Sequence, residues 1–98
     1  MAKSILQWDE RVCFKCGRNG IYDAIDEHIV FDGHEKQSDE FGLKVFLCHN
    51  DCHLFGRESV HKDKAFDFEL KRYAQRKAMI KHNLSEKEFA DIFGKSYI

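Results

Sequence analysis

The chain contains no proline and only six glycines among its 98 residues, and it shows no internal repeat or low-complexity linker. No apolar run approaches the ~20 residues of a membrane span, and the first residues, MAKSILQWDERVC, lack the hydrophobic region of a secretory signal. These absences predict one small domain, residues 1–98, located in the cytoplasm and without a membrane contact. An apolar share of 43%, with nine Phe, excludes a disordered chain.

The four cysteines are the main chemical signal, because a domain of this size buries a marginal core and a bound metal is a common supplement. They form two pairs, Cys13 with Cys16 in CFKC and Cys48 with Cys52 in CHNDC. In a reducing compartment such pairs favour a metal over disulfides. Zinc prefers four thiolate or imidazole ligands at tetrahedral corners, so the spacing predicts a structural Zn²⁺ on the four cysteines. Histidines adjoin the second pair, which leaves a site of three cysteines and one histidine as the alternative.

The first half of the chain predicts two strands and a short helix. Apolar and β-branched residues indicate strands over 21–31 and 43–48, with a polar loop over 32–42 between them. HNDCHLFG then indicates a short helix that ends at Gly56. Three residues, rather than two, separate the second pair of cysteines, and this spacing predicts a distorted first helical turn.

The second half predicts two packed helices. An apolar stripe indicates one helix over 65–79. Ser85 and Glu88 form the pattern of a capping box for a second helix, which is expected to end at Gly94. The fold class is therefore α+β: a zinc-stapled core over residues 1–62 and a helical extension over 63–98.

The net charge of −1 hides an uneven distribution. Residues 57–82 hold eight Lys or Arg and four Asp or Glu, a balance of +4, whereas residues 1–56 hold six and ten, a balance of −4. The basic segment is either a solvated helix face or a surface that faces phosphates. Any contact with DNA must be local, because the whole chain has no positive charge to attract it. The candidate nucleic-acid contacts are Arg57, Lys62, Lys71, Arg72 and Arg76.

The order of the motifs, CFKC, then DEHIV, then FLCHNDCH, resembles the zinc-stapled HNH endonucleases, in particular a small phage-encoded group. The resemblance extends over roughly residues 10–98 and includes SDEFGLKVFLC and FADIFGKSYI. It implies a treble-clef, ββα-metal fold and metal-dependent hydrolysis of phosphodiester bonds in DNA.

The resemblance also implies a role for each polar residue of these motifs. Phosphodiester hydrolysis needs a base for the attacking water and a cation on the phosphate oxygens. His28 takes the position of the general base. Glu27, His53 and His61 take the positions that hold a catalytic Mg²⁺ or Mn²⁺, with a phosphate contact as the alternative for His61.

One expected residue is missing, because SDEFGLKVFLC has no Asn to orient the base, and Asp39 or Ser38 is the available substitute. The alternative function is a zinc module that kept the fold, lost catalysis and binds DNA or a host or phage protein. In that case His28 is a core histidine, Glu27 a surface charge and His53 a part of the zinc site. The remaining histidines, His34, His49 and His82, are expected at the surface.

Overall fold

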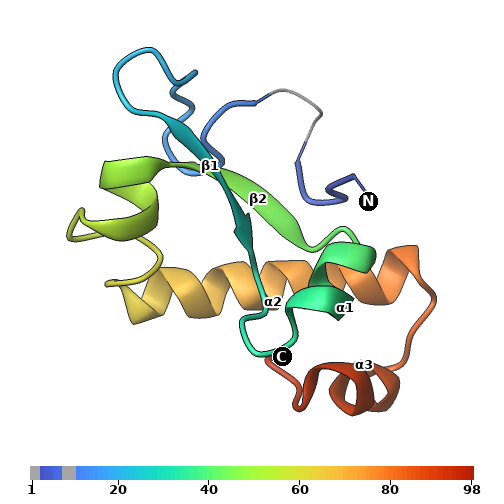
Figure 1. Ribbon diagram of the computed structural model, residues 1–98. Coiled ribbons are helices and arrows are strands. Elements are labelled where there is room, and N and C mark those ends of the chain that lie inside the picture. The colour runs from blue at the N-terminus through green and yellow to red at the C-terminus, as the bar shows by residue number, and fades with distance from the viewer. Residues whose placement is uncertain (1–2, 8–10) are drawn as a thin grey trace.

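The computed structural model describes residues 3–7 and 11–98. Strands β1 (Ile25–Ile29) and β2 (Lys44–Cys48) form an antiparallel pair. Figure 1 shows this pair near the centre, with helix α2 (Lys64–Lys81) crossing beneath it. None of the described helices is long and apolar enough to cross a membrane. The two strands and the helices confirm the α+β class.

The alternation of side chains along β1 decides which polar residues share a face. Cross-strand pairs join Asp26 to Leu47, Glu27 to Phe46 and His28 to Val45. Successive residues of a strand point to opposite faces. Asp26 and His28 therefore share one face with the buried Val45 and Leu47, and Glu27 points to the other.

Two boundaries in the first half differ from the sequence-based expectation. The strand is shorter than predicted, because Ile21 and Tyr22 precede it and are exposed. The predicted loop contains a short helix, α1 (Glu35–Glu40). Its buried Ser38 donates its hydroxyl to the Leu43 carbonyl at 2.6 Å, which closes the connection between the strands. Because the buried residue of this helix is a serine, the sequence shows no regularly spaced apolar residues here. The helix could therefore not be predicted from the sequence.

The short helix that follows β2 is a π-helix, η1 (His49–Leu54). The Phe55 N–H donates to the Asn50 carbonyl five residues earlier, at 2.8 Å. A π turn accommodates one residue more than an α turn, which accounts for the third residue between Cys48 and Cys52. The expected distortion at this position is confirmed.

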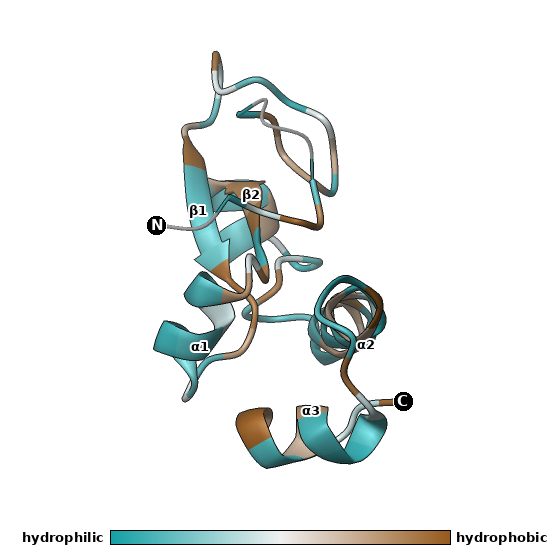
Figure 2. Cartoon of the chain, turned by 90° about the vertical axis from the view of Figure 1, so that its right-hand side faces the viewer, coloured by the Kyte–Doolittle hydropathy of each residue, from teal (hydrophilic) through white to brown (hydrophobic). Residues whose placement is uncertain are grey.

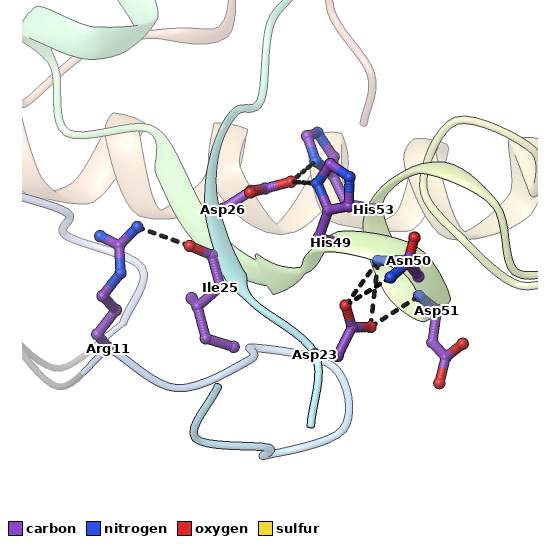
Figure 3. Close-up of polar contacts among 8 residues, drawn as sticks. All are labelled: Arg11, Asp23, Ile25, Asp26, His49, Asn50, Asp51 and His53. Carbon is purple, nitrogen blue, oxygen red and sulfur yellow. Dashed lines mark hydrogen bonds and ion pairs between the residues drawn. The ribbon is translucent and has the colours of Figure 1, made fainter. Parts of the chain in front are cut away.

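The carboxylate of Asp23 fixes the start of η1. It accepts hydrogen bonds from the Asn50 N–H at 3.0 Å and the Asp51 N–H at 3.1 Å, and Figure 3 shows it facing the first turn. At the other end, a Cβ on Gly56 would overlap the Asp51 carbonyl. The turn therefore closes tightly at both ends.

The helical extension follows the prediction closely. The Asp63 side chain accepts from two backbone N–H groups at the start of α2. Helix α3 (Glu86–Phe93) begins with the capping box of Ser85 and Glu88 and ends at Gly94, whose φ is 90°. Figure 2, which looks along α2, shows the strands and the N-terminal loops above and α2 with α3 below.

Aromatic residues join the extension to the strand pair. Phe31, two residues after β1, is 1% exposed. Its ring centroid lies 5.4 Å from that of Phe89 and 4.9 Å from that of Phe93, both on α3. This contact packs α3 against the end of the strand pair.

Candidate metal centres

The four cysteines form one cluster, here called the cysteine cluster. Their Sγ atoms all lie within 4.8 Å of one another, and all four thiols are free. The Sγ atoms of Cys16 and Cys48 are 3.7 Å apart. Zinc–sulfur bonds of about 2.3 Å at tetrahedral angles place two sulfurs about 3.8 Å apart. The cluster therefore has the dimensions to hold one metal ion such as zinc.

The backbone brings the two cysteine pairs together from separate elements. Cys13 and Cys16 sit in a tight turn, in which the Gly17 N–H donates to the Cys13 carbonyl at 2.9 Å. Cys48 ends β2, and Cys52 lies on η1. Each pair is preformed locally, so only the meeting of β2 with the turn requires the tertiary fold.

The cysteine thiols differ in how readily they ionise without a metal. Burial raises the pKa of Cys13, but hydrogen bonds, first from the Cys16 backbone, bring it to about 7. Burial raises the pKa of Cys48 to about 11 and that of Cys52 further. A bound cation favours the thiolate, so metal binding by this cluster releases protons.

Three histidines form a second group, here called the histidine cluster: His28 on β1, His53 on η1 and His61 in the loop before α2. One ring nitrogen of each lies within 4.8 Å of the others. The ring centroids are 5.2 Å apart for His28 and His53 and 4.9 Å for His53 and His61. Three imidazoles at these separations are a ligand set that suits a transition-metal ion.

His28 is the buried member of the histidine cluster. It is 7% exposed, and its Nε2 is buried without a hydrogen-bond partner. Burial, followed by the charges of His53 and His61, lowers the pKa of His28 to about 4. The ring is therefore neutral at pH 7. An unpaired buried nitrogen is costly unless it binds something, and a neutral imidazole is the form that binds a metal.

A small pocket opens beside the histidine cluster. It has a volume of about 170 Å³. Its lining combines two cluster members with two carboxylates and one ammonium group, from His28, Asp32, Val60, His61, Lys64 and Asp67. A small polar group can therefore approach His28 and His61 from this side.

A carboxylate that the sequence analysis did not select supports the cluster from β1. Oδ2 of Asp26 lies 2.6 Å from Nδ1 of His49 and 2.9 Å from Nδ1 of His53 (Figure 3). Asp26 precedes His28 by two residues and shares its face of the strand. In the sequence, Asp26 can be found by counting two residues back from His28, because alternate residues of a strand share a face.

Glu27, the acidic residue expected to join His28 and His53, is not brought to the cluster. It is exposed on the opposite face of β1, with Oε1 3.9 Å from Nζ of Lys44. It lines a surface hollow with Asp39, which is itself 2.5 Å from Lys44. Because adjacent side chains of a strand point to opposite faces, the strand that directs His28 into the cluster directs Glu27 away from it.

The substitutes considered for the missing Asn also lie elsewhere. Ser38 is buried and donates to the Leu43 carbonyl, and Asp39 pairs with Lys44. Neither lines the pocket beside His28. Two further histidines, His34 and His82, lie outside the histidine cluster. His34 directly precedes α1, and Nε2 of the exposed His82 lies 3.0 Å from the Phe41 carbonyl.

The candidate phosphate contacts fall into two groups. Arg57, Lys62 and Arg76 are exposed. Lys71 is engaged, because its Nζ lies 3.2 Å from Asp32 and 2.9 Å from Asp67, and its side chain is only 14% exposed. Arg72 is half-buried, and its Nη1 lies 3.8 Å from Glu69. The structure therefore offers fewer free cations than the sequence suggests.

No protein-family model matches this chain, and neither a curated protein nor a solved structure matches it. The chemistry of the two clusters and their surroundings is therefore the basis for a functional assignment.

Proposed function

We propose that the chain is a metal-dependent DNA endonuclease of the HNH type, built on a treble-clef zinc domain. One observation carries the proposal. His28, His53 and His61, which come from a strand, a π-helix and a loop, converge with an unpaired buried nitrogen at the edge of a polar pocket. A structural histidine would need a hydrogen-bond partner for that nitrogen.

In this proposal the cysteine cluster binds zinc and serves the fold. Thiolates select zinc, and a site closed by four protein ligands has no open position for a substrate. The zinc would join the turn at Cys13 and Cys16 to η1. Since η1 also carries His53, the zinc site indirectly positions the second cluster.

The histidine cluster would hold the second, catalytic ion. A divalent cation there supplies Lewis-acid activation of water and of a phosphate oxygen. His53 and His61 keep the ligand roles that the resemblance implies. His28 is proposed here as the third ligand instead of the base, because a pKa of about 4 makes a weak base and a neutral ligand.

This ligand set bears on the identity of the metal. Imidazole suits zinc, nickel and copper, whereas magnesium prefers carboxylate and water. Without Glu27, no carboxylate among the described residues joins the three imidazoles as a ligand. Ni²⁺ and Zn²⁺ are therefore expected to support activity better than Mg²⁺ or Mn²⁺.

The DNA surface is proposed at the exposed cations Arg57, Lys62 and Arg76. Each lost phosphate contact lowers the slope of log affinity against log salt by about one unit. Charge reversal at Arg76 should reduce this slope. Charge reversal at Lys71 should first destabilise the protein, because it leaves Asp32 and Asp67 facing a third negative charge.

Nicking of supercoiled plasmid DNA tests the proposal. Zinc-loaded protein is incubated with Mg²⁺, Mn²⁺, Ni²⁺ or added Zn²⁺, with and without a chelator, and compared with His28→Ala and His61→Ala. We expect nicking that depends on the ion and is lost in both variants. Equal nicking by the wild type and both variants under every ion would reject the nuclease and leave the zinc module that binds DNA or protein.

Metal affinity of His28→Ala separates the two roles of this residue. If His28 is a ligand, affinity for the second ion falls together with nicking. If His28 is the general base, nicking falls by about 10²–10⁴-fold while the ion still binds.

A further inference from the structure

We infer that Asp26 is a positioning residue that fixes the tautomer and the orientation of His53 within the histidine cluster, with His49 as its second anchor. The inference rests on the proposed metal-binding role of that cluster. It assigns a function to a carboxylate and an imidazole that the motif resemblance leaves without one.

The direction of the hydrogen bonds follows from the chemistry of the two groups. An aspartate carboxyl ordinarily titrates well below neutral pH, and one oxygen of Asp26 lies within hydrogen-bond distance of two imidazole nitrogens. The carboxylate is therefore ionised at neutral pH and can only accept. Both Nδ1 atoms, at 2.6 Å and 2.9 Å from the same Oδ2, must carry the hydrogen.

This arrangement determines which nitrogen of His53 is available. A neutral imidazole that donates from Nδ1 carries its lone pair on Nε2. Histidines that bind metals commonly donate their other N–H to a carboxylate, which orients the ring and makes the ligand more basic. Asp26 therefore prepares Nε2 of His53 to bind a cation before any cation arrives.

His49 completes the arrangement from one π turn earlier. Its side chain is 42% exposed, whereas that of His53 is 15% exposed and that of Asp26 is 29% exposed. Figure 3 shows both rings against the same end of the carboxylate. The second donor keeps Oδ2 directed towards η1. With a single donor, the carboxylate of Asp26 would be free to rotate about its Cβ–Cγ bond.

The first test measures Ni²⁺ affinity of the zinc-loaded protein by calorimetry. Loss of such a supporting partner typically costs about 10–100-fold in metal affinity, so Asp26→Ala should weaken Ni²⁺ binding by that factor. Asp26→Asn, which keeps an oxygen acceptor without the charge, should lie between Asp26→Ala and the wild type. His49→Ala should show a smaller loss than Asp26→Ala. The matched control is Asp51→Asn, which removes a carboxylate from the same π-helix that pairs with Arg18 instead of a histidine.

The second test does not depend on any metal in the histidine cluster. Nitrogen-15 NMR of the histidine rings, recorded before Ni²⁺ is added, should show His53 in the Nδ1–H form in the wild type. Asp26→Ala should shift it towards the Nε2–H form, which a merely structural role would not do. If His53 of the wild type is already in the Nε2–H form, the inference is overturned, whatever the variants do.

Failure of the inference can be told apart from failure of the proposed function. If His53→Ala and His61→Ala lose Ni²⁺ but Asp26→Ala binds it as the wild type does, only the positioning role is overturned. If none of the three loses Ni²⁺, the histidine cluster does not hold the ion, and the proposed function fails with it. If Asp26→Ala also loses its zinc, its Ni²⁺ affinity no longer reports on the positioning role. The Ni²⁺ affinity of Asp26→Asn and the wild-type NMR spectrum then test this role.

Discussion

The cysteine and histidine clusters are of similar size, and yet they are assembled in opposite ways. The cysteine cluster is made of two local pairs, each contained within four or five residues, and all four side chains are of one type. The histidine cluster takes one residue from a strand, one from a π-helix and one from a loop. One cluster can organise the fold around a metal, whereas the other exists only after the fold has formed. If the proposed function is right, loss of the metal from the cysteine cluster should unfold the protein, whereas loss of the ion from the histidine cluster should remove only the activity.

The largest effect is expected from the cysteine cluster. Cys48→Ser removes a buried ligand at the junction of β2 and η1, and structural zinc contributes about 10–16 kcal/mol of apparent binding energy in small domains. We expect loss of zinc and of the cooperative unfolding transition, measured by metal analysis and circular dichroism. A folded variant with the wild-type melting temperature would contradict the division between the clusters.

The second effect belongs to the histidine cluster. His53→Ala should retain one zinc and a folded core, because His53 is partly exposed and its removal leaves the cysteines in place. It should bind Ni²⁺ weakly and lose about 10²–10⁴-fold in nicking rate. Zinc analysis, calorimetry and plasmid nicking on one preparation check all three. Concurrent loss of zinc would show that the clusters are not independent.

The third effect is the part of the pH dependence of stability that comes from His28 in the histidine cluster. The pKa of His28 falls from an ordinary 6.5 to about 4 on folding, so the unfolded chain binds the extra proton. Stability from this residue is complete above pH 6.5 and is lost as the pH falls towards 4, by at most about 3 kcal/mol. Urea unfolding of the zinc protein at pH 7.0 and at about pH 5.5, without a second ion, measures it.

His28→Gln is the matched control. Like the wild type, this variant keeps the pH dependence that comes from the zinc site, but it has no imidazole to titrate at position 28. Its stability should fall less than that of the wild type over the same interval. Parallel curves would mean that His28 is not buried in its neutral form.

A smaller effect should reach both clusters at once. The Asp23 carboxylate accepts from the Asn50 and Asp51 N–H groups in the first turn of η1, and these hydrogen bonds outweigh burial and lower the pKa of Asp23. This π-helix carries Cys52 and His53. Asp23→Ala should cost about 1–2 kcal/mol, as loss of a helix cap does. Zinc and Ni²⁺ affinities should both decline, as measured by competition with a chelator. A decline in one affinity alone would mean that η1 does not couple the two sites.

The smallest effect is expected at Glu27, despite its position beside His28. Glu27→Gln should change Ni²⁺ affinity by less than about twofold, because its side chain lies on the opposite face of β1. Calorimetry measures the Ni²⁺ affinities of Glu27→Gln and Asp26→Asn. Both variants remove one negative charge, from neighbouring residues of β1. A larger loss at Glu27 than at Asp26 would restore the assignment made from the motif.

Several elements could be predicted because their information is local. Ser85 and Glu88 are three residues apart and bond to each other's backbone, so their capping box appears in the sequence as it does in the structure. The same holds for β2, whose apolar residues mark it directly. Helix α1 was missed because its stability depends on the buried Ser38, whose partners Phe31 and Leu43 lie outside the helix.

The cysteine cluster could be predicted from local spacing, since two short pairs of cysteines need only one closure of the chain to bring four sulfurs together. The sequence also indicated the irregular turn at η1, because three residues between Cys48 and Cys52 do not fit an ordinary turn. Local spacing does not predict the histidine cluster: the motif resemblance implied that its members belong to one site, and the tertiary structure brings them together. Whether His28 meets His61 depends on a strand, a π-helix and a loop that converge across 33 positions of sequence. Strand alternation then placed Asp26 with the histidines and turned Glu27 away, because adjacent side chains of a strand cannot reach the same face.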